Sequence, residues 1–194
     1  LLFSDKLSGI AEEVQSEYYL FLFMSVLGLM MLVSSVELLS IFVSLELSSF
    51  AVYVMVPMRK TGQLGSQSEA GIKYLLYGVV ATGFMLFGMS YVYGLTGSTQ
   101  LTVIAEKLSH LYHHPAAVVA ILLVLAGFFY KLALFPLHFW VPDVYEGASN
   151  ETTAFIATVP KIAAVALLVR IMNLVTADGE VIVNVLIVCA LLSM

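Results

Sequence analysis

The sequence predicts an all-α integral membrane protein whose helical bundle contains one discontinuous helix. Of its 194 residues, 61% are hydrophobic and only 11% are charged, and the mean hydropathy is +1.01. A typical soluble domain is about half apolar and a quarter charged. Apolar runs of about 20 residues recur, which is the length that an α-helix needs to cross the core of a bilayer. The alternating segments of an outer-membrane barrel are absent from the sequence.

The discontinuity is predicted in residues 126–147, AGFFYKLALFPLHFWVPDVYEG. Lys131 lies inside an apolar run, Pro136 follows five residues later, and His138 comes next. A proline inside a helix removes one backbone donor and clashes with the carbonyl four residues back. In a membrane this is tolerated only where protein or a wet cavity satisfies the freed groups. We therefore expect a helix break at Pro136 that forms part of an ion path.

The rest of the chain divides into spans and short connections. We expect residues 1–17 to be an interfacial or loop segment, and residues 18–194 to be a transmembrane helical domain of about five full spans and a truncated sixth. The predicted full spans are residues 18–36, 38–58, 69–94, 115–135 and 150–173. Because the sequence lacks an initial methionine and its last apolar run is short, we interpret it as a split gene product, a processed chain or a fragment.

The connections carry most of the remaining charge. Glu37 is expected to be a solvated turn residue. Arg59 and Lys60 place the connection at residues 57–68 in the cytoplasm or the mitochondrial matrix by the positive-inside rule. Ser68 is expected to cap the third span, which puts Lys73 one turn inside it. There, snorkelling to the interface and a functional role are both open.

Several smaller features have modest interpretations. Gly71, Gly78, Gly83 and Gly88 suit tight helix packing. Residues 101–112 are amphipathic and predict a short interfacial helix. The histidines at 110, 113 and 114 are interpreted as a solvated cluster rather than a metal site, because no carboxylate or cysteine completes a ligand set. Cys189, the single cysteine, is expected to be a buried apolar residue.

Three charges fall within predicted spans: Glu46, Lys131 and Lys161. On insertion scales they would together cost roughly 8–10 kcal/mol, so they are expected to face one another or water. Ser44, Ser48 and Ser49 accompany Glu46, and small hydroxyl residues allow close helix approach. Because the pKa of a lysine falls readily on burial, we predict a proton relay. A fixed structural ion pair is the alternative.

Five blocks of the sequence also resemble a known family. They are LVSSVELLSIFVSLELSSFAVYV, SEAGIKYLLYG, YGLTGSTQL, FYKLALFPLHFWVPDVYEGAS and TAFIATVPKIAAVALLVRI. Together they resemble subunit N (subunit 2) of complex I, the proton-pumping NADH:quinone oxidoreductase, over residues 18–173. The resemblance implies an antiporter-like bundle, a partial inverted-repeat fold with discontinuous helices. By this alignment the spans are similar to helices four to eight and part of the ninth.

The resemblance also implies roles for individual residues. It matches Glu46 to the buried glutamate of the family's fifth helix, Lys73 to a lysine of the sixth, Lys131 to the lysine of the broken seventh and Lys161 to the central lysine of the eighth. All four are expected to take part in proton translocation. Pro136 and His138 are expected to help form the break and its hydration.

The expected setting is a large enzyme complex. This chain is expected to carry no cofactor or metal, while FMN, iron–sulfur clusters and quinone belong to other subunits. Expected partners are other membrane-arm subunits, a second fragment of the same subunit, and lipids. The net charge of −5 gives no reason to expect nucleic acid.

The sequence leaves some alternatives open. The mitochondrial inner membrane is favoured, with a bacterial plasma membrane or a thylakoid as alternatives. A subunit of a cation/proton antiporter or a membrane hydrogenase, and a non-conducting structural fragment, are the rival functions.

Overall fold

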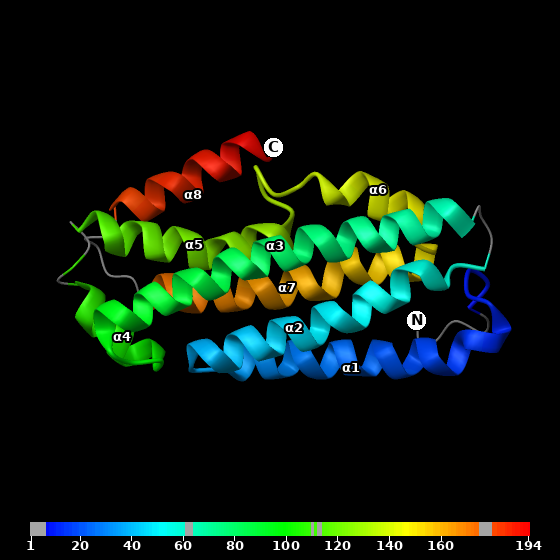
Figure 1. The fold of residues 1–194 in the computed structure, drawn as a ribbon, viewed down its shortest axis with the longest axis horizontal. Helices are drawn as coiled ribbons and strands as arrows, with labels where there is room; N and C mark the ends of the chain where they lie inside the picture. Colours follow the sequence, from blue (N-terminus) through cyan, green and yellow to red (C-terminus); the bar gives the residue numbers. More distant parts are fainter. Residues whose placement is uncertain (1–6, 61–63, 110, 112–113, 175–179) are drawn as a thin grey trace.

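The computed structural model describes residues 7–60, 64–109, 111, 114–174 and 180–194, and over these residues the chain forms an elongated helical bundle (Figure 1). The helices are α1 (Gln15–Ser34), α2 (Leu38–Met55), α3 (Leu64–Thr96), α4 (Leu101–Ser109), α5 (Pro115–Leu132), α6 (Trp140–Gly147), α7 (Asn150–Leu174) and α8 (Glu180–Leu192), with the 3₁₀ turns η1 (Glu12–Val14) and η2 (Val56–Met58). Among the described residues, five helical segments are long and apolar enough to cross a membrane. The predicted class, an all-α membrane protein with a discontinuous helix, is confirmed.

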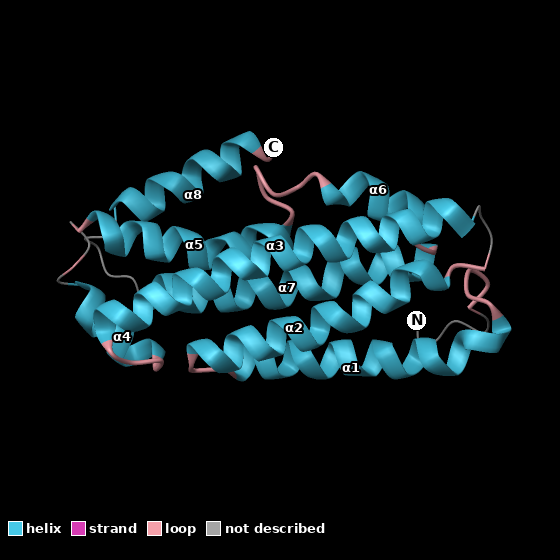
Figure 2. Ribbon diagram, viewed as in Figure 1, coloured by secondary structure: helices cyan, strands magenta, loops and turns pink. Residues whose placement is uncertain are grey.

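The long helices run along a common axis. α1 and α2 form an antiparallel hairpin, α3 packs along both α5 and α6, and α7 contacts α1, α2 and α5 (Figure 1). The short α4 lies at one end of the bundle, and α8 packs on α5. Loops are confined largely to the two ends of the bundle and to the connection between α5 and α6 (Figure 2). Among the residues that the structure describes, this connection is where irregular backbone enters the middle of the bundle.

Two helix starts differ from the prediction. α1 begins at Gln15 rather than at residue 18, and Glu17 in its first turn has the charge that a helix N-terminus favours. α3 begins at Leu64 rather than at residue 69, so the expectation that Ser68 caps this helix is wrong. Polar residues mimic a loop at this position, but Gln67 is 4% exposed and packing extends the helix through them. Lys73 therefore lies more than two turns inside α3.

α4 occupies the segment that was predicted as an amphipathic interfacial helix. Its buried side chains, Leu101, Ile104 and Leu108, follow the spacing of three and four that the sequence shows. His110 and His113 of the predicted histidine cluster lie outside the described residues.

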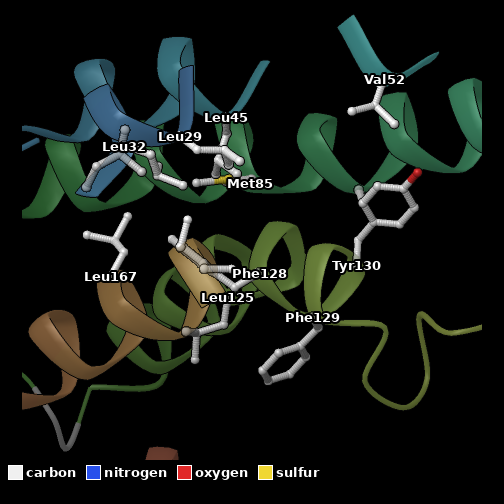
Figure 3. Packing of buried hydrophobic residues seen from close by; sticks show 14 of the residues in the cluster. Leu29, Leu32, Leu45, Val52, Met85, Leu125, Phe128, Phe129, Tyr130 and Leu167 are labelled. Atoms are coloured by element: carbon white, nitrogen blue, oxygen red, sulfur yellow. The ribbon is translucent and has the colours of Figure 1, made fainter. Parts of the chain in front are cut away.

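The core is built from apolar side chains of α1, α2, α3, α5 and α7 (Figure 3). Glycines bring helices close together at two places. A Cβ atom on Gly28 of α1 would lie 2.7 Å from the Ser48 nitrogen of α2, and one on Gly88 of α3 would lie 2.6 Å from the Val124 nitrogen of α5. Gly83, also expected at a contact, has nothing within 4 Å of its Cβ position. It faces outward, on the face of α3 that carries exposed residues such as Val79 and Phe87.

Candidate functional site

The discontinuous helix ends before its proline. α5 stops at Leu132, Ala133 takes a left-handed conformation with φ 59°, and α6 starts at Trp140. Pro136 lies within the connection, four residues after Leu132. Proline cannot donate to the carbonyl four residues before it and clashes with that carbonyl, so Pro136 disfavours continuing α5 beyond Leu132.

The backbone groups freed by the break find partners. The Trp140 indole donates from Nε1 to the Tyr130 carbonyl at 3.1 Å, and the Leu134 nitrogen donates to the Phe129 carbonyl at 2.9 Å. The Phe135 nitrogen donates to Ser193 Oγ, at the end of α8, at 2.9 Å. Such partners are required wherever irregular backbone lies at membrane depth. The break is therefore held by its own aromatic residues and by a neighbouring helix.

Lys131 lies in the last turn of α5 and is 3% exposed. Its Nζ donates to Ser49 Oγ of α2 at 2.9 Å, and Ser49 Oγ itself donates to the Leu45 carbonyl at 2.7 Å. A buried ammonium is costly unless it is paired and hydrogen-bonded. One serine hydroxyl supplies that hydrogen bond, which makes Ser49 a site residue that the sequence suggested only as a neighbour of Glu46.

Glu46 is the predicted site residue on α2, three residues before Ser49. Its side chain and that of Lys131 act on one another electrostatically, yet neither of the salt bridges in the described part of the chain joins them. Glu46 Oε1 is buried and has no hydrogen-bond partner among the described residues. Lys131 is therefore bonded to Ser49 rather than to Glu46, and the coupling of the two charges stays a prediction.

The other two serines near Glu46 do different work. Ser48 bonds to Ser25 of α1, with 2.9 Å between their hydroxyl oxygens, and Ser44 donates to the Ser40 carbonyl in its own helix at 2.6 Å. The Ser25–Ser48 bond joins α1 to α2, and the Ser44 bond lies within α2. Neither Ser44 nor Ser48 forms a hydrogen bond with Glu46 among the described residues.

Lys161 lies at the middle of α7, directly after Pro160, and is half-buried. Its Nζ lies 5.9 Å from the ring centroid of Tyr145 on α6, within the range of a cation–π contact. No hydrogen bond or salt bridge of the described residues joins it to Glu46 or Lys131. Aromatic rings connect the two lysine neighbourhoods instead.

These rings form a cluster that the sequence analysis missed. We define the aromatic cluster as Tyr53, Tyr74, Tyr130, Trp140 and Tyr145. Trp140 is its centre, with ring centroids 4.7 Å from Tyr74, 5.3 Å from Tyr130 and 6.3 Å from Tyr145. Tyr130 follows Phe129 immediately before Lys131, and Figure 3 shows its ring pointing from α5 toward α3. A continuous set of ring contacts thus extends from Lys131's neighbour to the ring beneath Lys161.

Lys73 stands apart from the buried charges. Its Nζ lies 2.7 Å from Glu69 Oε1 and 2.8 Å from Asp143 Oδ2 of α6, and its side chain is 37% exposed. With Glu146 these residues line a polar pocket of about 180 Å³. Lys73 is therefore held in an ion-pair network between α3 and α6.

His138 lies in the connection between the two half-helices. Its ring stacks on Phe139 at 4.5 Å, and its Nδ1 is buried without a partner among the described residues. Glu37, expected to be solvated, instead accepts a hydrogen bond from Thr99 Oγ1 at 2.6 Å. It thereby ties the α1–α2 turn to the α3–α4 connection, a contact between residues too distant in sequence to be foreseen.

The comparisons with known proteins agree with this geometry. A family model described as NADH:quinone oxidoreductase/Mrp antiporter, TM, matches residues 35–194. NADH-quinone oxidoreductase subunit N 2 of Opitutus terrae is 50% identical over 195 residues, which cover 100% of this chain and 40% of that protein. The chain thus spans about two fifths of the length of this curated relative. The predicted resemblance to subunit N is confirmed.

Solved structures show the same fold. Respiratory complex I from Thermus thermophilus with bound aureothin contains a chain that is 37% identical, with a TM-score of 0.68, covering 79% of this chain and 34% of that one. An archaeal membrane-bound sulfane sulfur reductase matches with a TM-score of 0.83 at 23% identity, over 95% of this chain and 38% of that one; at this identity the match speaks for the fold alone. The chain therefore belongs to the transmembrane NADH:quinone oxidoreductase/Mrp antiporter family.

Proposed function

We propose that this chain forms part of the proton-translocating subunit N in the membrane arm of an NADH–quinone oxidoreductase. The observation that carries the proposal is the arrangement at the break: a buried Lys131 ammonium, held by Ser49, beside a Glu46 carboxylate with which it forms no direct pair. Intramembrane ionisable residues are functional by default because they are costly. The identity to subunit N over the whole chain supports the same function.

Each buried charge has a role in this proposal. Glu46 and Lys131 form a coupled pair, in which moving or protonating the carboxylate changes how strongly the lysine holds its proton. Lys161 is the central relay toward the rest of the subunit. Lys73 carries protons only indirectly, because its two carboxylate partners hold it at an exposed pocket. Pro136 and His138 shape the break and its hydration.

The proposed setting follows from the relatives. The subunit N relatives that match this chain are bacterial, such as that of Opitutus terrae, so we infer a bacterial plasma membrane rather than the mitochondrial inner membrane that the sequence favoured. Other membrane-arm subunits and lipids are the proposed partners. FMN, iron–sulfur clusters and quinone are placed in other subunits, so electrons travel elsewhere. Within the described residues there is no group of three His, Cys, Asp or Glu that could hold a metal ion.

The test uses the complete complex in native membrane vesicles. Lys131→Met and Lys161→Met are compared with Lys60→Met, which neutralises an exposed lysine outside the bundle. The first two should lower the protons pumped per NADH oxidised, and Lys60→Met should not. If Lys161→Met pumps the wild-type number of protons per NADH at the wild-type rate of NADH oxidation, the proposal is refuted. Native electrophoresis with an NADH-dehydrogenase stain shows whether each variant is assembled.

A cation/proton antiporter is the second candidate, because the matching family model covers Mrp antiporters as well. Transport that depends on a sodium gradient and needs neither NADH nor quinone would select it. A purely structural role predicts another outcome: neutralising Glu46 and Lys161 together would alter assembly and leave the proton stoichiometry of assembled complexes unchanged.

A further inference from the structure

A buried hydroxyl near Lys131 has no partner. Tyr53 of α2 is 6% exposed, and its Oη forms no hydrogen bond with any described residue. Buried hydroxyls are nearly always hydrogen-bonded, because an unpaired one loses the free energy of its hydration. The Tyr53 hydroxyl is therefore an unused hydrogen-bond donor next to the proposed proton-carrying site.

Its position on α2 aims it at the partner of Lys131. Tyr53 follows Ser49 by four residues, a spacing that places both on one face of a helix. The polar neighbours of its hydroxyl include the Ser49 and Tyr130 hydroxyls. Ser49 Oγ in turn accepts a hydrogen bond from Lys131 Nζ and donates one to the Leu45 carbonyl. Tyr53 is thus the next hydroxyl after Ser49 along this face.

The opposite helix accommodates this hydroxyl against a glycine. A Cβ atom on Gly78 of α3 would lie 1.9 Å from Tyr53 Oη and 3.1 Å from Tyr130 Oη. Any other residue at position 78 would fill the space that both hydroxyls share. The Tyr130 hydroxyl donates to the Tyr74 carbonyl at 2.7 Å, so its own donor is already used.

The chemistry of lysine requires a change of partner at this site. An ammonium has three donors and no acceptor, and Ser49 Oγ accepts from it. Once Lys131 has passed its proton on, the neutral amine carries a lone pair that needs a donor. Ser49 can supply one by turning its O–H from the Leu45 carbonyl to Lys131 Nζ, but its own oxygen then needs a new donor.

We propose that Ser49 and Tyr53 form a reversible hydrogen-bond pair that holds Lys131 in both protonation states. With the ammonium, Lys131 donates to Ser49, Ser49 donates to the Leu45 carbonyl and Tyr53 waits without a partner. With the neutral amine, Tyr53 donates to Ser49 and Ser49 donates to Lys131. No proton crosses the hydroxyls, since each keeps its O–H bond and only the direction of donation reverses. Ser49 and Tyr53 are positioning residues, and their role rests on the proposed function of Lys131.

The titratable groups around this pair come from three helices. They are Glu46 on α2, Tyr74 on α3 and Tyr130 with Lys131 on α5. Of these, only the Lys131 amine is proposed to change its hydrogen bonds with Ser49. Removing the Tyr53 hydroxyl should therefore favour the ammonium form of Lys131 over the neutral amine, and should slow the release of its proton.

The test compares Tyr53→Phe with Tyr77→Phe, a change at an exposed tyrosine of α3, in vesicles that contain the complete complex. Tyr53→Phe keeps the ring that meets Tyr74 edge-on at 4.8 Å. It should lower the rate of coupled turnover by about three- to tenfold, the worth of one net hydrogen bond, and shift the pH profile of turnover toward higher pH. Ser49→Ala removes the partner of both forms of Lys131, so it should lower the rate without the shift toward higher pH. Ser49→Thr should restore activity, and Ser44→Ala should act as wild type.

The outcomes separate this inference from the proposed function. If Lys131→Met abolishes pumping while Tyr53→Phe keeps the wild-type rate and pH profile, the hydrogen-bond pair is refuted and the proposed function stands. If Lys131→Met pumps normally, both are refuted. A lower rate in Tyr53→Phe with an unmoved pH profile also overturns the inference, because it marks a purely structural effect.

Discussion

Replacing Gly88 by alanine tests how closely α3 must approach the helix that carries Lys131. The added Cβ would lie 2.6 Å from the Val124 nitrogen and 2.8 Å from the Ala120 oxygen, both in the backbone of α5. Backbone atoms inside a helix cannot move aside as a flexible side chain does, so the two helices must separate. Overpacking of this kind costs about 1–3 kcal/mol.

The chain offers a matched control five residues away on the same helix. Gly83→Ala places its Cβ in open space, where alanine adds up to about 1 kcal/mol of helix stability over glycine. Because alanine gains this helix stability at both positions, the two variants should differ by the overpacking alone, about 1–3 kcal/mol.

The measurement is the temperature at which the subunit leaves the detergent-solubilised complex, followed by native electrophoresis after stepwise heating. Gly88→Ala should dissociate at a clearly lower temperature than wild type, and Gly83→Ala at the same or a higher one. Coupled proton pumping should fall in Gly88→Ala alone, because α5 carries Lys131. Equal midpoints for the two variants would refute the close helix contact.

Three further experiments have defined outcomes. Trp140→Phe removes the indole donor to the Tyr130 carbonyl and some ring volume, and should cost about 1–3 kcal/mol in the same dissociation assay; an unchanged midpoint would argue against the bond. Thr99→Val removes the hydrogen bond to Glu37, which is worth about 1.5–3 kcal/mol for a charged acceptor, and limited proteolysis should then cut the α3–α4 connection faster than in wild type. Ser25→Ala and Ser48→Ala, combined in a double-mutant cycle, should show a coupling of about 0.6 kcal/mol, the average for hydrogen bonds between membrane helices; strictly additive effects would exclude the Ser25–Ser48 bond.

The sequence predicted the spans well because their physical signal is strong. Runs of about 20 apolar residues have few alternatives to a membrane helix, and a charge inside such a run, such as Lys131, is conspicuous. Pro136 indicated the helix break for an equally simple reason, because proline has no backbone N–H to donate within a helix. The start of α3 was missed because Gly65, Ser66 and Ser68 have the composition of a loop, and only tertiary packing favours a helix there.

The site itself was only half visible in the sequence. Glu46 and Lys131 are conspicuous as charges in apolar spans, but their spacing along the chain contains nothing about Ser49, which accepts the hydrogen bond from Lys131. The aromatic cluster was missed because its members come from α2, α3, α5 and α6, and each tyrosine alone resembles an interfacial anchor. Likewise, Gly83 and Gly88 differ only in the direction that they face, and helices that are apolar all round give no sign of that direction.

The indole of Trp140 gives the broken helix an unusual mechanical character. It belongs to the first residue of one half-helix and bonds to a carbonyl in the last turn of the other, so it acts as a cross-brace over the joint. To swing the two halves apart, the protein would have to give up this bond and pull the central ring out of its stack. A braced joint favours gating by small rotations of hydroxyls and ammonium groups within a stiff frame over large excursions of the helices.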